Sequence, residues 1–134
     1  MYELKKEFWI SASHRLTNPN FDEEKNLKVY GKCHNMPSHG HNYKVIVVLR
    51  NTEIPDTGML MNFSVVKNIF SRWIDHNYDH QFLNDCAGFE NLPATAENMA
   101  KIFYDILKEH ITDLYSVEIQ ETEGASAVYY GDDE

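Results

Sequence analysis

Three histidines and a cysteine in the first third of the chain are the residues best suited to hold a metal and do chemistry. His39 and His41 flank a single glycine, and Cys33 lies six residues before His39. Alternate residues of a strand share a face, so the two imidazoles can converge on one point. With His14 from a neighbouring strand they supply three ligands and leave a fourth position open, the pattern of catalytic zinc. If Cys33 is the fourth ligand, the site is closed and structural.

The segment that ends in His14 has the alternation of a β-strand. Over residues 2–13, apolar side chains occupy most even positions, and most odd positions are polar or charged. This period of two predicts a strand with His14 at its end, on the apolar side. Residues 43–50 are rich in β-branched side chains and predict a second strand directly after His41. The polar residues 17–32 between them predict a loop that carries Cys33 towards the site.

The rest of the chain predicts two helices followed by two strands. Apolar residues at helical spacing over 63–74 predict the first helix. Pro93-Ala94-Thr95 marks the start of the second helix, capped by Thr95 and ending near His110. Alternation over 117–121 and β-rich residues over 127–130 predict the last two strands. The order ββααββ is that of an α+β fold with two helices on one face of a four-stranded antiparallel sheet.

Length, charge and cysteine content narrow the class of protein. A chain of 134 residues predicts a single domain over residues 1–134. The net charge of −9 argues against nucleic acid and membrane as partners, and no apolar run approaches membrane-spanning length. Any anionic substrate therefore needs local cations, for which Arg15, Lys28 and Lys32 are candidates. Only Cys33 and Cys86 are present, which predicts a reducing, cytoplasmic setting.

Two further acidic positions could take part in chemistry. Asp79 precedes His80 and could orient it and stabilise its protonated form, provided that the chain turns there; the alternative is a solvent-exposed loop. Glu121 shares a strand face with the apolar Val117 and Ile119, where an unpaired carboxylate is costly. Its partner is either a planar ligand with two adjacent N–H donors or a buried lysine or arginine.

In addition to these features, the chain resembles the 6-pyruvoyl-tetrahydropterin synthase family, which includes the 6-carboxy-tetrahydropterin synthases of queuosine biosynthesis. The matching pieces occur in family order over nearly the whole chain, and the ordered set is highly specific. They are Ser11-Ala12-Ser13-His14-Arg15-Leu16, Tyr30-Gly31-Lys32-Cys33, His39-Gly40-His41-Asn42-Tyr43, Thr57-Gly58-Met59, Met61-Asn62-Phe63, Tyr78-Asp79-His80, Thr95-Ala96-Glu97-Asn98 and Glu121-Thr122.

The resemblance implies the tunnelling fold, in which trimers close their sheets into a barrel and two trimers stack as a homohexamer. It implies the substrate 7,8-dihydroneopterin triphosphate, a Zn²⁺ cofactor and sites where subunits meet. Residue by residue, it implies zinc ligands at His14, His39 and His41, a catalytic base at Cys33, a proton relay at Asp79 and His80, and a pterin anchor at Glu121. Thr95 and Thr122 match further substrate-binding positions.

One departure bears on the product. Five residues separate Cys33 from His39, as in the pyruvoyl synthases of tetrahydrobiopterin biosynthesis, whereas the queuosine enzymes typically have three. The expected reaction is therefore conversion to 6-pyruvoyl-tetrahydropterin, with 6-carboxy-tetrahydropterin synthesis as the alternative. Other hypotheses are a cyclohydrolase or aldolase on the same fold and a non-catalytic zinc- or pterin-binding protein. Classical zinc hydrolysis is disfavoured because the chain has no His-Glu-x-x-His.

Overall fold

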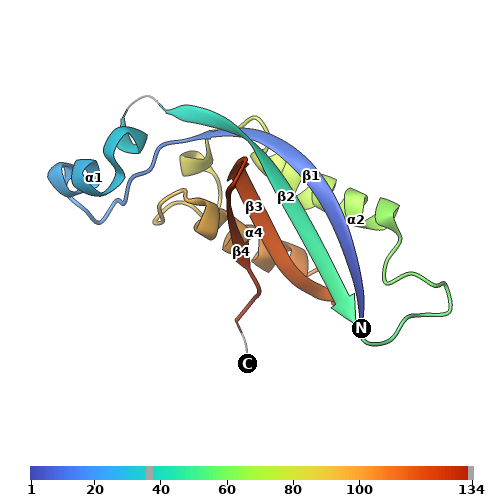
Figure 1. Ribbon diagram of the computed structural model, residues 1–134. Helices are drawn as coiled ribbons and strands as arrows, with labels where there is room; N and C mark the ends of the chain where they lie inside the picture. Colours follow the sequence, from blue (N-terminus) through green and yellow to red (C-terminus); the bar gives the residue numbers. More distant parts are fainter. Residues whose placement is uncertain (36–37, 133–134) are drawn as a thin grey trace.

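The computed structural model describes residues 1–35 and 38–132 and forms one antiparallel sheet with helices on one face (Figure 1). The strands lie in the order β1-β2-β3-β4. Their bounds are β1 (Tyr2–His14), β2 (His39–Asn51), β3 (Leu114–Thr122) and β4 (Ala125–Tyr129). The helical elements are α1 (Glu23–Tyr30), η1 (Gly31–His34), α2 (Phe63–Phe70), η2 (Ser71–Asp75), α3 (His76–Tyr78), η3 (Leu83–Asp85) and α4 (Ala96–Lys108).

The alternation of β1 places one face of the sheet in the core. Ile10, Ala12 and His14 are buried, whereas Glu3 and Lys5, on the opposite face, are more exposed. This face packs on the apolar sides of α2 and α4, which lie behind the sheet in Figure 1. The predicted fold, a four-stranded antiparallel sheet with the order ββααββ, is therefore confirmed.

The two covering helices begin where the sequence predicts. The hydroxyl of Thr95 accepts a hydrogen bond from the Asn98 N–H at 3.2 Å and caps α4, which ends at Lys108, two residues before His110. The helix α2 is capped by Asn62 and continues through the five-residue π-helical turn η2 into α3. The predicted helix over 63–74 is therefore found, with its last turn wound more widely than an α-helix.

The prediction of a loop over residues 17–32 is wrong in part. Residues Glu23–Tyr30 form α1, which is capped by the Asp22 carboxylate and ends at Gly31 with a φ of +57°. Apolar periodicity does not predict this helix, because its single buried residue is Asn26, while Leu27 and Val29 are exposed. Its stability rests on its cap, on acidic residues in its first turn and on contacts of its N-terminal end.

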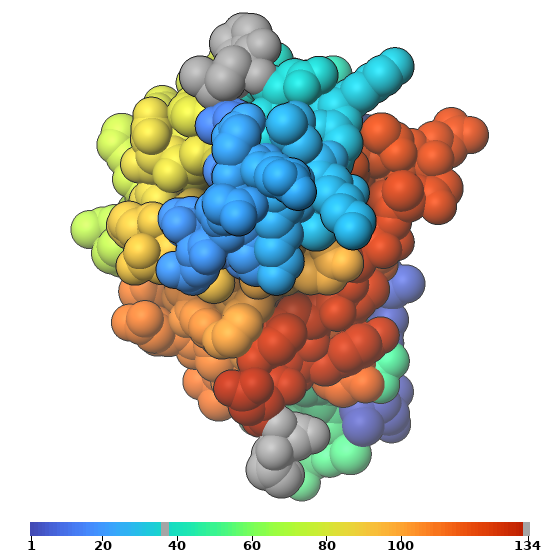
Figure 2. All heavy atoms as spheres, turned by 90° about the vertical axis from the view of Figure 1, so that its left-hand side faces the viewer, coloured from blue at the N-terminus to red at the C-terminus, as the bar shows by residue number. Residues whose placement is uncertain are grey.

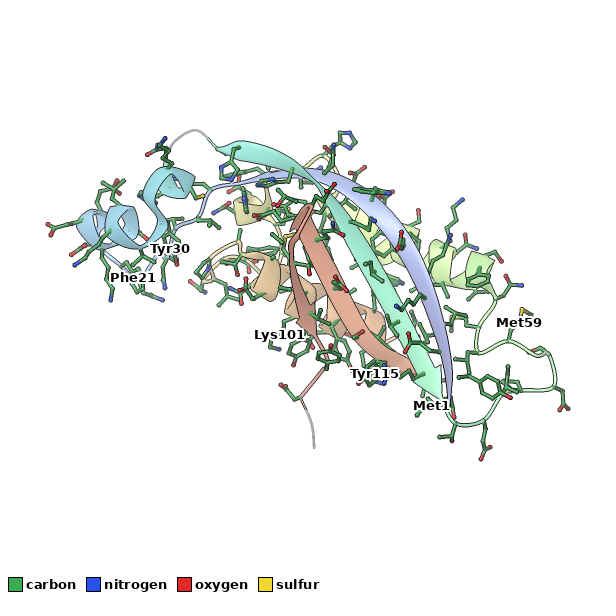
Figure 3. The ribbon with its side chains drawn as sticks, in the orientation of Figure 1. Met1, Phe21, Tyr30, Met59, Lys101 and Tyr115 are labelled. Carbon is green, nitrogen blue, oxygen red and sulfur yellow. The ribbon has the colours of Figure 1, made fainter. Side chains whose placement is uncertain are left out.

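Helix α1 lies beyond the end of the sheet where β1 ends and β2 begins (Figure 1). Figure 3 labels Phe21 and Tyr30 there, at the opposite end of the molecule from Met1 and Met59. That end of the sheet also carries the three histidines singled out above. Among the described residues, no helix has the length and apolar character needed to cross a membrane.

Candidate metal centre and active site

The three histidines come together through the register of two strands. His14 at the end of β1 pairs with His39 at the start of β2, and His41 pairs with Ala12. Directly paired residues of antiparallel strands stand on the same face. All three imidazoles therefore stand on the helix-covered face of the sheet, at its edge beyond the apolar core.

The imidazole rings surround one point. Their centroids lie 4.6 Å apart for His14 and His39, and 5.0 Å apart for each of these rings and His41. The Nε2 atoms of His14 and His39 are separated by 3.0 Å. Each side chain offers one nitrogen, and these nitrogens all lie within 4.8 Å of one another. This is the spacing of donors that converge on a single metal ion.

The protonation of the cluster also suits a metal. The Nδ1 of His14 lies 2.7 Å from the carbonyl oxygen of Ala94, which can only accept, so Nδ1 carries the proton and Nε2 keeps its lone pair. Burial lowers the pKa of His14 and of His41, although the carboxylate of Glu121 opposes the shift. Among the described residues the buried Nε2 of His41 has no hydrogen-bond partner. Neutral imidazoles with available lone pairs are what a divalent transition metal requires.

Cys33 approaches this end of the sheet from η1 but is not part of the donor cluster. The groups of described residues that could hold a metal comprise the three histidines without the thiol. The backbone carbonyl of Cys33 accepts a hydrogen bond from the Leu16 N–H at 2.7 Å, so the turn is tied to the chain just after β1. The side chain is partly exposed and free of any disulfide. This geometry favours three protein ligands over a closed site with Cys33 as the fourth.

Glu121 faces the histidine cluster from β3. The pairing of β3 with β4 shifts between Gln120 and Thr122, and such an irregularity re-aims a side chain. The Oε1 of Glu121 lies 3.7 Å from the Nε2 of His14 and 3.9 Å from that of His41. In the part of the chain that the structure describes, no lysine or arginine pairs with it. Of the two partners considered from sequence, the lysine or arginine is therefore not found among the described residues.

A cavity of about 250 Å³ lies beside Glu121. Thr95 and Ala96 at the start of α4 form one wall, and Ala125 and Ser126 of β4 form another. Thr122, by contrast, is exposed and does not line this space. One molecule bound in this cavity could contact both Glu121 and Thr95. Thr122 lies outside it.

The Asp79–His80 pair is held on the outer edge of β1. The Ser11 N–H donates to Asp79 Oδ1 at 2.7 Å, and the Ser13 N–H donates to the carbonyl of Gln81 at 3.0 Å. His80 adopts a φ of +60°, and its Nδ1 lies 2.8 Å from Asp79 Oδ2. The chain therefore turns at this point, as it must for Asp79 to orient the imidazole of His80. The imidazole of His80 is 80% exposed, so its other nitrogen faces outwards.

Two residues near the site are not among the functional residues predicted from the sequence. Asn84 clamps the backbone of Arg15: its Oδ1 accepts from the Arg15 N–H at 2.9 Å, and its Nδ2 donates to the Arg15 carbonyl at 2.7 Å. This side-chain amide acts as a strand partner directly after His14. Tyr43 stands beside His41 on β2, and its buried hydroxyl has no hydrogen-bond partner among the described residues. A polar atom on an otherwise apolar strand face is the signal that could have drawn attention to Tyr43.

Comparison with known proteins identifies the family to which this geometry belongs. The family model for 6-pyruvoyl tetrahydropterin synthase matches residues 3–132. Human 6-pyruvoyl tetrahydrobiopterin synthase is 37% identical over 133 residues, which are 97% of this chain and 92% of that protein. The 6-carboxy-5,6,7,8-tetrahydropterin synthase of Bacillus subtilis is 32% identical over 139 residues, covering 96% of this chain and 84% of that protein.

A solved structure supports the same family assignment. The 6-pyruvoyl tetrahydropterin synthase of Caenorhabditis elegans superposes with a TM-score of 0.92 at 32% identity, covering 98% of this chain and 96% of that one. The agreement extends over nearly the full length of both chains. The chain therefore belongs to the 6-pyruvoyl tetrahydropterin synthase family of pterin-processing enzymes.

Proposed function

We propose that this protein is a zinc-dependent 6-pyruvoyl-tetrahydropterin synthase that converts 7,8-dihydroneopterin triphosphate with loss of triphosphate. The observation that carries the proposal is the three-histidine centre, with Glu121 and a 250 Å³ cavity beside it. His14, His39 and His41 would hold the zinc ion. Bound there, zinc supplies Lewis acidity that makes the adjacent C–H bonds of the substrate side chain more acidic.

The remaining site residues bind the substrate or transfer protons. The carboxylate of Glu121 accepts two hydrogen bonds from the N–H groups of the pterin ring, and Thr95 lines the same cavity. Cys33, as a thiolate, removes a proton from the substrate side chain. His80, oriented by Asp79, carries a proton back to the neighbouring carbon. Elimination of triphosphate and an internal redox tautomerisation give the product without an external oxidant.

The exposure of His80 supports a site completed by a second subunit. Asp79 is bound to the outer edge of β1, whereas the histidine cluster stands on the helix-covered face of the same strand. A proton relay that faces outwards has no use in an isolated chain. We infer that Asp79 and His80 serve the Cys33 of a neighbouring subunit in a homohexamer built as two trimers.

The second candidate function is 6-carboxy-tetrahydropterin synthesis from the same substrate. The Bacillus subtilis relative that carries this name covers 96% of the chain, so the candidate is a specific one. The five-residue spacing between Cys33 and His39 and the higher identity to the human synthase, 37% against 32%, favour the pyruvoyl product. Two of the five spacing residues, Met36 and Pro37, lie outside the described residues.

A product assay separates the candidates. Purified protein is loaded with zinc, incubated with 7,8-dihydroneopterin triphosphate and analysed by mass spectrometry. A 6-pyruvoyl product is expected; a 6-carboxy product together with acetaldehyde would establish the second candidate. Turnover only of a guanine nucleotide or of dihydroneopterin without its triphosphate would identify a cyclohydrolase or an aldolase. Absence of turnover with every substrate in a metal-replete sample would favour a non-catalytic binding protein.

A further inference from the structure

A buried polar network joins the residue after His14 to the residue after Cys33. Those two residues are Arg15 and His34. His34 is the last residue of η1 and is only 2% exposed, although nothing in the proposed chemistry uses its imidazole. A buried histidine outside the metal cluster and the relay requires an explanation, because burying a polar ring without partners costs stability.

The guanidinium of Arg15 is directed at His34. Its Nε donates to the backbone carbonyl of His34, and its Nη2 lies 3.0 Å from the Nε2 of the imidazole. From sequence, Arg15 is a candidate for binding an anionic substrate; in the structure at least two of its nitrogens are engaged by one residue. Because the guanidinium contacts both the backbone and the side chain of His34, it fixes the orientation of the whole η1 turn.

The imidazole of His34 is held at both nitrogens. Its Nδ1 lies 3.2 Å from the carbonyl oxygen of Leu16, and its Nε2 lies 3.0 Å from the Oε1 of Glu23 as well as near Arg15. The neutral ring donates from Nδ1 and accepts from Arg15 at Nε2. The protonated ring donates to Leu16 and Glu23 instead. In either state both nitrogens have a partner, so the ring holds one position.

Helix α1 supplies the outer member of the network. Glu23 is the first residue of α1, and its side chain is 70% exposed, so its contact with His34 is a screened one of small energy. In Figure 2 the blue atoms of this segment face the viewer. Through Glu23 the helix contacts the turn that carries Cys33.

We propose that His34, gripped by Arg15, is a positioning residue that fixes Cys33 relative to the histidine centre. The proposal deepens the proposed function, because it rests on Cys33 acting there as the base. The hydrogen bond from the Leu16 N–H to the Cys33 carbonyl runs beside the network, so the strand end and the turn are joined by backbone and side chains alike.

Stability alone does not account for such a network. Desolvating a guanidinium and an imidazole offsets much of what their contacts contribute, and apolar packing of similar volume would hold a turn at lower cost. Directional bonds provide something that apolar contacts do not, namely a fixed distance and angle. Misplacing a reacting group by about 1 Å can cost about 100-fold in rate, which makes a fixed thiol valuable.

The reactivity of the two cysteines tests the proposal without relying on turnover. Iodoacetamide labelling is followed for Cys33 and Cys86 by peptide mass spectrometry in the wild type and in His34→Ala and Arg15→Lys. Burial raises the pKa of the Cys86 thiol, so this residue is a slowly reacting internal reference. Release of the turn should label Cys33 about tenfold faster, because a locally opened segment exposes its side chains more often. Labelling of Cys86 should be unchanged.

Glu23 and Glu24 offer a matched pair for the outer contact. Both are exposed acids in the first turn of α1, but only Glu23 contacts His34 among the described residues. Glu23→Gln should accelerate Cys33 labelling slightly and Glu24→Gln not at all, since the two changes remove the same charge from the same helix end. If His34→Ala does not fold, Arg15→Lys together with this pair still tests the proposal.

Steady-state kinetics complete the test. Arg15→Lys and His34→Ala should lower kcat by about 10- to 100-fold with little change in KM, and zinc content should stay at the wild-type value. Wild-type Cys33 labelling and kcat in both variants would overturn the positioning role, as would equal acceleration of Cys33 and Cys86, which indicates general unfolding. Full turnover by Cys33→Ser would instead refute Cys33 as the base, while the labelling result still decides whether the network fixes the thiol.

Discussion

The histidine centre and the Asp79–His80 pair are both attached to β1, yet they are built in opposite ways. The centre follows from strand register, and its first member, His14, is 1% exposed. The pair lies on a loop that is pinned to the strand edge, and its imidazole is 80% exposed. The centre uses relaxed strand geometry, whereas His80 holds a left-handed backbone conformation that is unfavourable for a residue with a Cβ.

The proposed function explains this difference. Metal ligands must keep fixed distances, and a paired strand is the most rigid support that the chain offers. A proton carrier must reach a substrate, and in the proposed assembly that substrate belongs to a neighbouring subunit. In the proposed enzyme the histidine centre is complete within the chain, and the Asp79–His80 pair acts on the site of the neighbouring subunit.

Removing a ligand should break the first region most severely. For His39→Ala we expect loss of bound zinc and a fall in kcat/KM of about 10³-fold or more, because the Lewis acidity of a metal is worth several kcal/mol in the transition state. Zinc is measured by plasma mass spectrometry after gel filtration. His110→Ala is the control, since His110 stacks on Trp73 away from the cluster and should retain the metal. Zinc content unchanged in His39→Ala would contradict the assignment of the centre.

Two replacements of His80 should separate activity from stability in the second region. His80→Ala and His80→Gly both remove the imidazole, so each should lower kcat by about 10²-fold or more while zinc is retained. Glycine should nevertheless give the more stable protein, by about 1 kcal/mol, because it adopts a φ of +60° without a Cβ clash. Urea unfolding of the two variants measures the difference. A more stable alanine variant would show that the backbone at position 80 relaxes.

Acid should destabilise the histidine centre in metal-free protein. Burial lowers the pKa of His14 and of His41 below the 6.5 of an ordinary histidine. Below pH 6.5 these histidines therefore bind protons in the unfolded chain but not in the folded one. The free energy of unfolding declines as the pH falls towards their folded-state pKa values. Urea unfolding with chelator between pH 7 and pH 5 should show this decline. His14→Asn should reduce this decline, because it removes one of the two buried imidazoles; an unchanged slope in His14→Asn would contradict the prediction.

The smallest effect concerns the tyrosine next to the centre. The Tyr43 hydroxyl is buried without a hydrogen-bond partner in the described part of the chain, and burial raises its pKa, so it remains a phenol. Tyr43→Phe should leave stability unchanged or raise it by up to about 1 kcal/mol, since an unsatisfied group is removed. Tyr78→Phe is the matched control: the Tyr78 hydroxyl donates to the Ala87 carbonyl at 2.8 Å, so its loss should cost about 1 kcal/mol. Equal losses in the two variants would reveal a partner for Tyr43.

Much of this arrangement is predictable from the sequence because it is local. The alternation before His14, the shared face of His39 and His41 and the Thr95 cap each depend on residues a few positions apart. Local periodicity and capping preferences carry that information directly. They failed at α1, where the buried position is a single asparagine and the usual apolar stripe is missing.

The distant relationships were decided by the tertiary structure. The sequence alone determined which side chains could bind a metal and which strand face each would occupy. It did not determine that His14 lies opposite His39, that Glu121 faces His14, or that Arg15 grips His34. Each of those contacts joins residues that are distant in the sequence. They meet only when the strands of the sheet have paired in the correct register. Their geometry is therefore a property of the packed fold, and no spacing within a single segment encodes it.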